Sequence, residues 1–310
     1  MHILGIKATT LTTALLYIIF VSCANPSNAQ THNASDISAI GPESFEVLRQ
    51  FYDYDKGVPL DATITGQIEG NGYVREKIIF RGHRSQVPGY LAIPQDGNAP
   101  FPVVLLLHGV TSSKESWWEE NNTMERLTKQ LLASGYAVLT LDSEYHGERS
   151  GNSEFKSPID FLEKGWFVQF RDMTIQSVID YRRGLDYLAT RADIDMSRVG
   201  MVGYSMGGMM TFILSAVDER ISLAVSCVSP IVTVPYLPTA VQNFAPFIRD
   251  TPFLMLMATS DERNYSRETA NQVFNLLASE NKRLEFFESG HMLPKEWPGH
   301  AIKWIETHLR

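Results

Sequence analysis

The sequence predicts an α/β protein, with a mostly parallel sheet, helices on both faces and an antiparallel hairpin at its N-terminal side. Short apolar segments typical of buried strands alternate along the chain with longer segments of helical periodicity. The chain has 310 residues, 44% of them hydrophobic and 20% charged, and is therefore large and apolar enough for one extended core. Strands that alternate with helices favour a parallel sheet covered on both sides.

The hairpin comes first among the predicted elements. Tyr73–Arg81 and Val87–Ile93 are rich in β-branched and aromatic residues, and residues 82–86 between them have the composition of a turn. We expect this hairpin to form the edge of the sheet. The strands and helices that follow are predicted at Val103–Leu107, Thr123–Ser134, Ala137–Leu141, Arg171–Thr190, Val199–Val202, Met206–Val217, Ile221–Val228, Phe253–Ala258, Ser266–Glu280, Arg283–Phe287 and Trp297–Leu309.

The N-terminal residues 1–29 are predicted to be a signal peptide. Lys7 gives a positive start, residues 11–21 are apolar apart from threonines, and Ser27-Asn28-Ala29 offers small residues to signal peptidase. The apolar run is short for a bilayer span, which needs about 20 residues. Because Phe20-Val21-Ser22-Cys23 loosely resembles a lipobox, a lipid anchor at Cys23 is the alternative to cleavage after Ala29. Either way the protein is expected to be exported, to the periplasm or outside the cell, with no membrane span in the mature chain.

Residues 30–71 are predicted to be a polar leader that ends in a short helix, and residues 72–310 to be the α/β domain. Apolar side chains of the helix would pack onto the domain, namely Phe45, Val47, Leu48 and Phe51. Two long inserts, at residues 145–170 and 229–250, interrupt the alternation of strands and helices. Such loops at strand ends often bind ligands, so both are candidate walls of a substrate pocket. The alternative is that they pack against neighbouring helices.

The composition disfavours several classes of partner. A formal net charge of −8, without a dense cluster of Lys and Arg, argues against binding to nucleic acid. Cys227 is the one cysteine outside the targeting segment, so we expect no intrachain disulfide and a buried, inert thiol. No spacing of His and Cys suggests a metal site, and no cofactor is expected.

Ser205 is the strongest candidate for a catalytic nucleophile. It lies in Gly203-Tyr204-Ser205-Met206-Gly207, directly after a predicted strand and directly before a predicted helix. A serine on so sharp a turn has a strained backbone that exposes its hydroxyl, and the flanking glycines let strand and helix approach closely. The N-terminus of the helix lends partial positive charge to a developing anion.

A nucleophilic serine needs a base, and the base needs a group that orients it. Asp261 follows the strand Phe253–Ala258 and His291 follows the strand Arg283–Phe287, in the chain order serine, acid, histidine that suits a serine on such a turn. The carboxyl ends of these strands lie at the same edge of the sheet as Ser205. Glu262 and Glu288 are alternative acids, but we favour Asp261, because Glu262 would point elsewhere on its loop and Glu288 would still belong to its strand.

Two backbone groups are predicted to stabilise an oxyanion. One is the N–H of Met206, and the other is the N–H of Val110, in a loop that Gly109 allows to turn. We expect His108 to hydrogen-bond within this loop rather than to act as a second base. Three residues are candidates for substrate binding, namely His146, Trp166 and Tyr204. For His146 the alternative is a purely structural role.

From about residue 72 to 310 the chain resembles the α/β-hydrolase superfamily, in particular its dienelactone-hydrolase-like and acetyl-xylan-esterase-like branch. The resemblance lies in Leu106-Leu107-His108-Gly109, in the motif around Ser205, in the Asp261 loop and in Ser289-Gly290-His291. It implies an eight-stranded, mostly parallel sheet and the hydrolysis of small-acyl carboxylic esters through an acyl-enzyme, without metal or cofactor. True dienelactone hydrolases use a cysteine nucleophile, so Ser205 does not favour the dienelactone substrate itself.

Two other functions are compatible with parts of this pattern. A serine peptidase of the prolyl-oligopeptidase kind would share the three catalytic residues, but it usually carries a propeller, for which the roughly 40 residues before the hairpin leave no room. A noncatalytic binding protein could share the fold. The intact set of Ser205, Asp261 and His291 argues against this second alternative. The sequence does not distinguish an acetylated sugar, an aryl ester or a lactone as the substrate.

Overall fold

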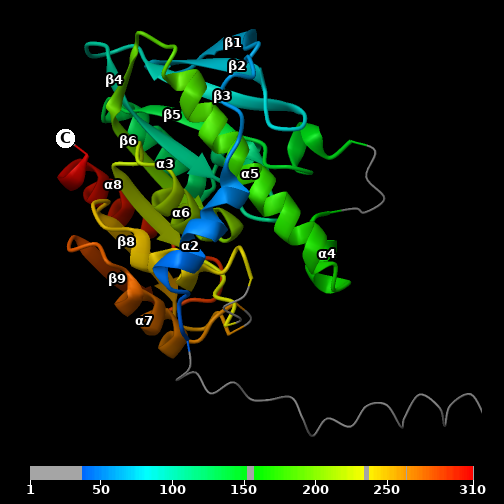
Figure 1. Cartoon of the computed structure of the whole chain (residues 1–310). Helices are drawn as coiled ribbons and strands as arrows, with labels where there is room; N and C mark the ends of the chain where they lie inside the picture. The colour runs from blue at the N-terminus through cyan, green and yellow to red at the C-terminus, as the bar shows by residue number, and fades with distance from the viewer. Residues whose placement is uncertain (1–36, 152–156, 234–236, 263, 310) are drawn as a thin grey trace, which may run out of the picture. The chain divides into compact units, whose positions relative to one another are not determined.

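In the computed structural model, nine strands form one sheet with helices on both faces (Figure 1). The structure describes residues 37–151, 157–233, 237–262 and 264–309. The predicted signal peptide and the possible lipid anchor at Cys23 lie outside the described residues. Within the described part of the chain, no helix is long and apolar enough to cross a membrane.

The order of the strands confirms the predicted fold class. The sheet runs β1-β2-β3-β5-β4-β6-β7-β8-β9, and all pairs from β5 to β9 are parallel. The first three strands pair antiparallel, and β3 joins β5 antiparallel as well. The strands are β1 Thr63–Glu69, β2 Tyr73–Arg81, β3 Gln86–Pro94, β4 Phe101–Leu107, β5 Ala137–Leu141, β6 Ile194–Tyr204, β7 Leu223–Cys227, β8 Phe253–Ala258 and β9 Lys282–Phe287.

Strand β1 corrects two predictions. The sheet has nine strands rather than eight, and its edge is β1 rather than the hairpin β2–β3, because β1 pairs with the outer side of β2. All seven residues of β1 are exposed, so neither face imposes the alternation of apolar and polar residues by which a strand is found in a sequence. A register shift between Ile64 and Gly66 weakens the signal further. This strand lies within the predicted leader of residues 30–71.

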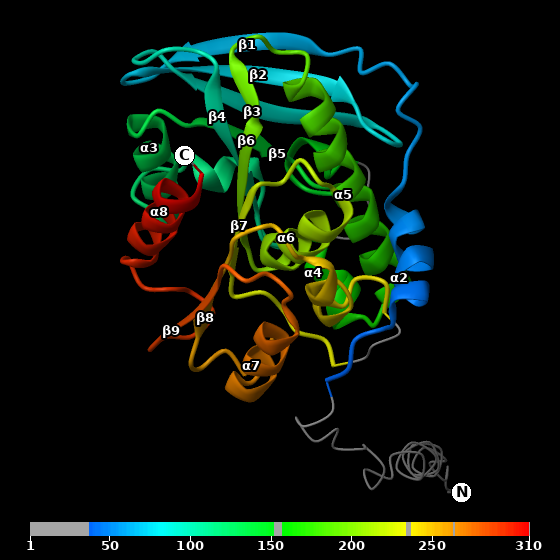
Figure 2. The same cartoon turned by 60° about the vertical axis from the view of Figure 1, so that its left-hand side comes forward.

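Helices cover both faces of the sheet, with α3 and α8 on one side and α5 and α6 on the other (Figure 2). The helices are α2 Pro42–Arg49, α3 Thr123–Ala133, α4 Ile159–Glu163, α5 Phe167–Leu188, α6 Met206–Val217, α7 Arg267–Leu276 and α8 Trp297–His308. Helix α2 confirms the short helix predicted before the domain. It buries Phe45 and Leu48, whereas Val47 and Phe51 are exposed.

Part of the second insert packs against helix α2 and the turn that follows it. Phe45 stacks on Phe247 at a centroid distance of 3.7 Å, and the Tyr52 hydroxyl donates a hydrogen bond to the Pro238 carbonyl at 2.8 Å. The Ile40 N–H donates to Asn243 Oδ1 at 3.2 Å. Of the two interpretations of the second insert, these contacts therefore favour packing against neighbouring elements over a role as a pocket wall for residues 237–250.

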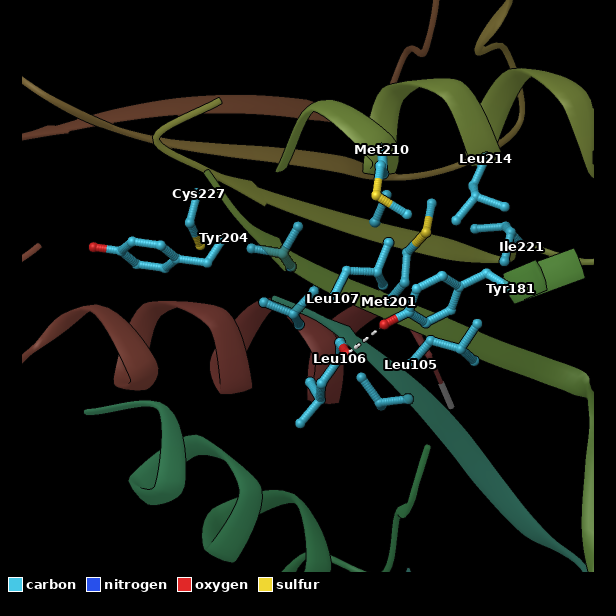
Figure 3. Close-up of a cluster of buried hydrophobic side chains, with 14 of the residues drawn as sticks. Leu105, Leu106, Leu107, Tyr181, Met201, Tyr204, Met210, Leu214, Ile221 and Cys227 are labelled. Carbon is cyan, nitrogen blue, oxygen red and sulfur yellow. Dashed lines mark hydrogen bonds between the residues drawn. The ribbon is translucent and has the colours of Figure 1, made fainter. Parts of the chain in front are cut away.

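The core fixes the relative positions of β4 and β6. Leu105, Leu106 and Leu107 of β4 are fully buried beside Met201 of β6, and the hydroxyl of Tyr181 in α5 donates to the Leu106 carbonyl at 3.1 Å (Figure 3). Burial of each such aliphatic side chain contributes about 1.5–3 kcal/mol. The register pairs Leu107 with Gly203, so the loop after β4 begins beside the turn after β6.

Candidate active site

Ser205 occupies a strained turn between β6 and α6. Its φ is 56° and its ψ is −114°, a positive φ that L-residues rarely adopt and that costs on the order of 1–3 kcal/mol. The Ser205 N–H donates to the carbonyl of Cys227 at 2.9 Å, which ties the turn to the end of β7. The surrounding backbone therefore holds the hydroxyl above the carboxyl end of the sheet, as predicted for a serine in this motif.

Two glycines make this turn possible. A Cβ atom on Gly203 would lie 2.1 Å from the Gly207 carbonyl oxygen, and one on Gly207 would lie 2.2 Å from the Leu107 carbonyl oxygen. Both contacts are with backbone, which cannot move aside as a flexible side chain can. The close approach of strand and helix that the sequence predicted is confirmed.

We expect Gly207→Ala to lower the free energy of unfolding by about 3 kcal/mol, at the upper end of the usual cost of overpacking. The added methyl group would push α6 away from β4. Urea denaturation followed by circular dichroism measures the change.

Gly299→Ala is the matched control. Gly299 is exposed within α8, and a Cβ atom there would meet nothing within 4 Å. Alanine should stabilise this helix by about 0.5–1 kcal/mol, because it loses less backbone entropy than glycine. Equal effects of the two substitutions would contradict the close approach at Gly207.

The structure brings the three predicted catalytic residues together. His291 Nε2 lies 3.0 Å from Ser205 Oγ, and His291 Nδ1 lies 2.6 Å from Asp261 Oδ2. Asp261 is buried in the loop after β8, whereas the side chain of His291 keeps 36% of its surface exposed. An ionised carboxylate can only accept, so Nδ1 carries a proton and Nε2 is free to accept one from Ser205. This is the arrangement of a nucleophile, a base and an orienting acid.

Asn264 contacts two of the three predicted catalytic residues and was not predicted from the sequence. Its Nδ2 donates to Asp261 Oδ1 at 2.7 Å, and the same nitrogen lies 3.1 Å from His291 Nδ1. Asn264 therefore engages the carboxylate oxygen that His291 does not use. An asparagine three residues after an aspartate is ordinary in a turn, and no pattern in the sequence separates it from other loop asparagines.

The hydroxyl of Tyr204, a predicted substrate-binding residue, anchors the loop of His291. Its hydroxyl donates to the His291 carbonyl at 2.9 Å and accepts from the Leu293 N–H at 2.8 Å. The ring is 3% exposed, and burial raises the pKa of Tyr204. A hydroxyl engaged by two backbone groups fits a positioning role better than a contact with substrate.

The loop after β4 lies against the nucleophile. A Cβ atom on Gly109, the residue before Val110, would be 3.5 Å from Ser205 Cβ. Met206 is the first residue of α6, and its N–H has no acceptor within the helix. Both predicted oxyanion donors are thus near Ser205.

His108 is buried in this loop, and its hydrogen bonds define its tautomer. The Ser143 N–H donates to His108 Nε2 at 3.1 Å, so the proton is on Nδ1, which donates to the Gly109 carbonyl at 2.8 Å. Burial holds the pKa of His108 well below its usual value. This geometry fits the structural role that we expected for His108.

A buried lysine, Lys114, stabilises the loop after β4 through ion pairs. The Lys114 ammonium, fully buried, donates to Asp142 Oδ2 at 2.8 Å and to Glu148 Oε1 at 2.7 Å. Burial alone would lower the pKa of Lys114, but these two carboxylates raise it above its usual value. The ion pairs tie the loop after β4 to the loop after β5. This cluster was not predictable from the sequence, because its members are far apart in the chain.

The other two predicted substrate residues belong to the first insert. His146 is 3% exposed, with Nδ1 2.7 Å from the Glu144 carbonyl and Nε2 2.9 Å from the Val110 carbonyl. Burial lowers the pKa of His146. Trp166 is 37% exposed and lies 6.3 Å from the ring of Phe161. His146 is therefore engaged by backbone, whereas Trp166 presents part of its surface to solvent.

The described residues contain no group of three His, Cys, Asp or Glu side chains that could hold a metal ion. What the site holds is a hydroxyl, an imidazole and a carboxylate in hydrogen-bonded series beside two candidate oxyanion donors. That arrangement can carry out nucleophilic acyl transfer.

Comparison with known proteins places the chain in a family. The family model for the alpha/beta hydrolase fold matches residues 102–297, more than half of the chain. YtaP of Bacillus subtilis, a protein named as a hydrolase, is 29% identical over 158 residues, which cover 49% of this chain and 51% of YtaP. The hydrolyase poxO of Penicillium oxalicum is 30% identical over 150 residues, 48% of this chain and 31% of that protein. The matches thus span about half, or less, of these curated relatives.

The solved structures agree on the fold. Acetyl xylan esterase 1 from Thermoanaerobacterium sp. superposes with a TM-score of 0.69 at 16% identity, covering 88% of this chain and 96% of that one. At this level of identity the likeness concerns the fold alone. Taken with the family match and the strand order, it shows that the chain belongs to the α/β-hydrolase fold family.

Proposed function

We propose that the protein is a serine esterase that hydrolyses carboxylic esters of small acyl groups. The observation that carries this proposal is the hydrogen-bonded series Ser205–His291–Asp261, with distances of 3.0 and 2.6 Å, at the carboxyl edge of the sheet. The names of the relatives, which include hydrolases and an acetyl xylan esterase, support the same class of reaction.

In the first half of the reaction, Ser205 Oγ attacks the ester carbonyl and His291 Nε2 takes the hydroxyl proton. Asp261 stabilises the imidazolium that forms, and the N–H groups of Met206 and Val110 hold the oxyanion. Collapse of the tetrahedral intermediate breaks the bond to the alcohol, which leaves with the proton of His291. An acyl-enzyme on Ser205 remains.

In the second half, His291 removes a proton from water, which attacks the acyl-enzyme. The second tetrahedral intermediate expels Ser205 Oγ, which recovers the proton from His291, and the carboxylic acid is released. Each half uses the same oxyanion donors. The cycle needs no metal ion and no cofactor.

The proposal includes an exported protein. The apolar N-terminal residues 11–21 and the small residues before position 30 support a signal peptide of residues 1–29, with lipidation of Cys23 as the alternative. Mass spectrometry of the N-terminus of the protein isolated from its host distinguishes a free N-terminus at Gln30 from a lipid-modified Cys23.

A panel of substrates tests the proposed function. We expect hydrolysis of p-nitrophenyl acetate, with kcat/KM falling at least about tenfold by p-nitrophenyl octanoate, because a site specific for small acyl groups would not accommodate the longer acyl chain. An anilide of a proline-containing peptide should not be cleaved. Faster cleavage of the anilide than of any ester would favour the peptidase alternative, and no turnover of any member would favour a binding protein.

A further inference from the structure

The direction of the Val110 N–H depends on the two peptide planes that meet at Val110. The first plane contains the Gly109 carbonyl and the Val110 N–H, and in a planar trans peptide these two groups point in opposite directions. His108 Nδ1 holds the Gly109 carbonyl at 2.8 Å. The second plane contains the Val110 carbonyl, which His146 Nε2 contacts at 2.9 Å. Two buried histidines therefore hold the planes on both sides of the residue.

Holding both planes fixes the two backbone dihedral angles of Val110, because each residue has no other soft backbone torsion. The loop carries small and polar residues after Val110, at Thr111, Ser112 and Ser113, and Thr111 is exposed. The Ser112 N–H also donates to the Gly109 carbonyl at 3.2 Å, so a turn closes over Val110 and Thr111 and supports the first plane, whereas the Val110 carbonyl of the second plane is contacted by His146. The catalytic proposal requires a single, preorganised direction for the Val110 N–H.

On this basis we propose that His146 is a positioning residue, whose Nε2–H donates to the Val110 carbonyl and so aims the Val110 N–H at the oxyanion. This proposal rests on the function proposed above. His146 does not touch the reacting atoms in this account. Its ring lies 4.8 Å from the ring of His108, so the pair forms one buried support under the loop.

The surroundings of His146 require a hydrogen-bond donor, and a neutral imidazole carries one N–H, which we assign to Nε2. Both ring nitrogens face backbone carbonyls, of Glu144 and Val110, and carbonyls can only accept. The side chain is 3% exposed, which leaves little surface for a substrate. It reaches from the loop after β5 to the loop after β4 and joins two segments separated by 36 residues.

A matched pair of substitutions separates the two contacts of the ring. The amide nitrogen of glutamine can take the place of Nε2, and that of asparagine can take the place of Nδ1. His146→Gln therefore keeps a donor for Val110, whereas His146→Asn keeps one for Glu144 only. We expect kcat for p-nitrophenyl acetate to fall about 30- to 100-fold in His146→Asn, somewhat less than the roughly 10²- to 10³-fold for loss of an oxyanion donor, because the Val110 N–H is misdirected rather than removed, and less than about fivefold in His146→Gln. KM should change little in either.

The inhibition constant of a trifluoromethyl ketone distinguishes a positioning role of His146 from a merely structural one, because a merely structural role would leave this constant unchanged. Such a ketone adds Ser205 Oγ to its carbonyl and places an oxyanion between the donors, so its inhibition constant should rise in His146→Asn in parallel with the loss of kcat/KM. His146→Gln should bind it nearly as the wild type does. Equal losses in the two variants, or a rise in KM without a fall in kcat, would overturn the proposal.

The protonation of the ring is measurable without any variant. In the wild-type protein with ¹⁵N-labelled histidine, the chemical shifts of His146 should show a proton on Nε2, in the neutral ring or in the cation. A ring protonated on Nδ1 alone would overturn the proposal, even if His146→Asn failed to fold. The proposed function fails separately: it is contradicted if Ser205→Ala keeps its turnover, whatever the result at His146.

Discussion

Ser205→Ala is expected to lower kcat for p-nitrophenyl acetate by about 10⁴- to 10⁶-fold, as removal of a nucleophile does in other serine hydrolases. The variant keeps His291, Asp261 and both oxyanion donors, but it has no atom that can form the acyl-enzyme. Residual turnover above that in water would come from the donors and from binding alone. Stopped-flow or steady-state release of p-nitrophenol measures the loss.

The stability of the same variant is the control. Ser205 contributes one hydroxyl, which contacts His291 at 3.0 Å, so its removal should change the unfolding temperature by only a few degrees. Turnover within about tenfold of the wild type, in a variant that unfolds at the wild-type temperature, would contradict the role of Ser205.

Asp261→Asn should lower kcat by about 10⁴-fold, almost as much as Ser205→Ala does. Asn264 Nδ2 donates to Asp261 Oδ1, so the oxygen of the new amide should turn toward Asn264 and its NH₂ group toward His291. The NH₂ group would then donate to Nδ1 and place the histidine proton on Nε2. In that tautomer His291 cannot accept the proton of Ser205.

Two neighbouring glutamates are controls for Asp261. Glu262 is exposed on the same loop, and Glu288 accepts a hydrogen bond from Thr259 at 3.3 Å on the exposed surface. Glu262→Gln and Glu288→Gln should each leave kcat within about twofold of the wild type, since neither contacts His291 and exposed charges have weak effects. If either glutamine variant lost as much activity as Asp261→Asn, the orienting acid would have to be reassigned.

The elements that carry the site were predictable because each depends on local sequence. The strands before Ser205 and Asp261 end in buried runs that are largely apolar, the strand before His291 ends in Phe286 and Phe287, and parallel strands bring their carboxyl ends to one edge. The glycines around Ser205 identify the turn, and the strained backbone there follows from the motif. The position of these residues at one edge of the sheet could therefore be predicted from strand order, without knowledge of long-range side-chain contacts.

What could not be predicted depends on contacts between distant parts of the chain. Strand β1 has no buried face, so only its pairing with β2 identifies it. The burial of Lys114 follows from the carboxylates of Asp142 and Glu148, which a hydropathy pattern does not reveal. The hydroxyl of Tyr204 could be assigned to the His291 loop only once β6 and that loop were placed side by side.

The most direct test of the central claim is to locate the covalent bond that an activated serine would form. After incubation of the native protein with a fluorophosphonate, peptide mass spectrometry should find one adduct per chain, on Ser205, and none after heat unfolding, because only the folded site activates the hydroxyl. An adduct on another residue, or ester hydrolysis that continues in a protein whose Ser205 is unmodified, would contradict the account.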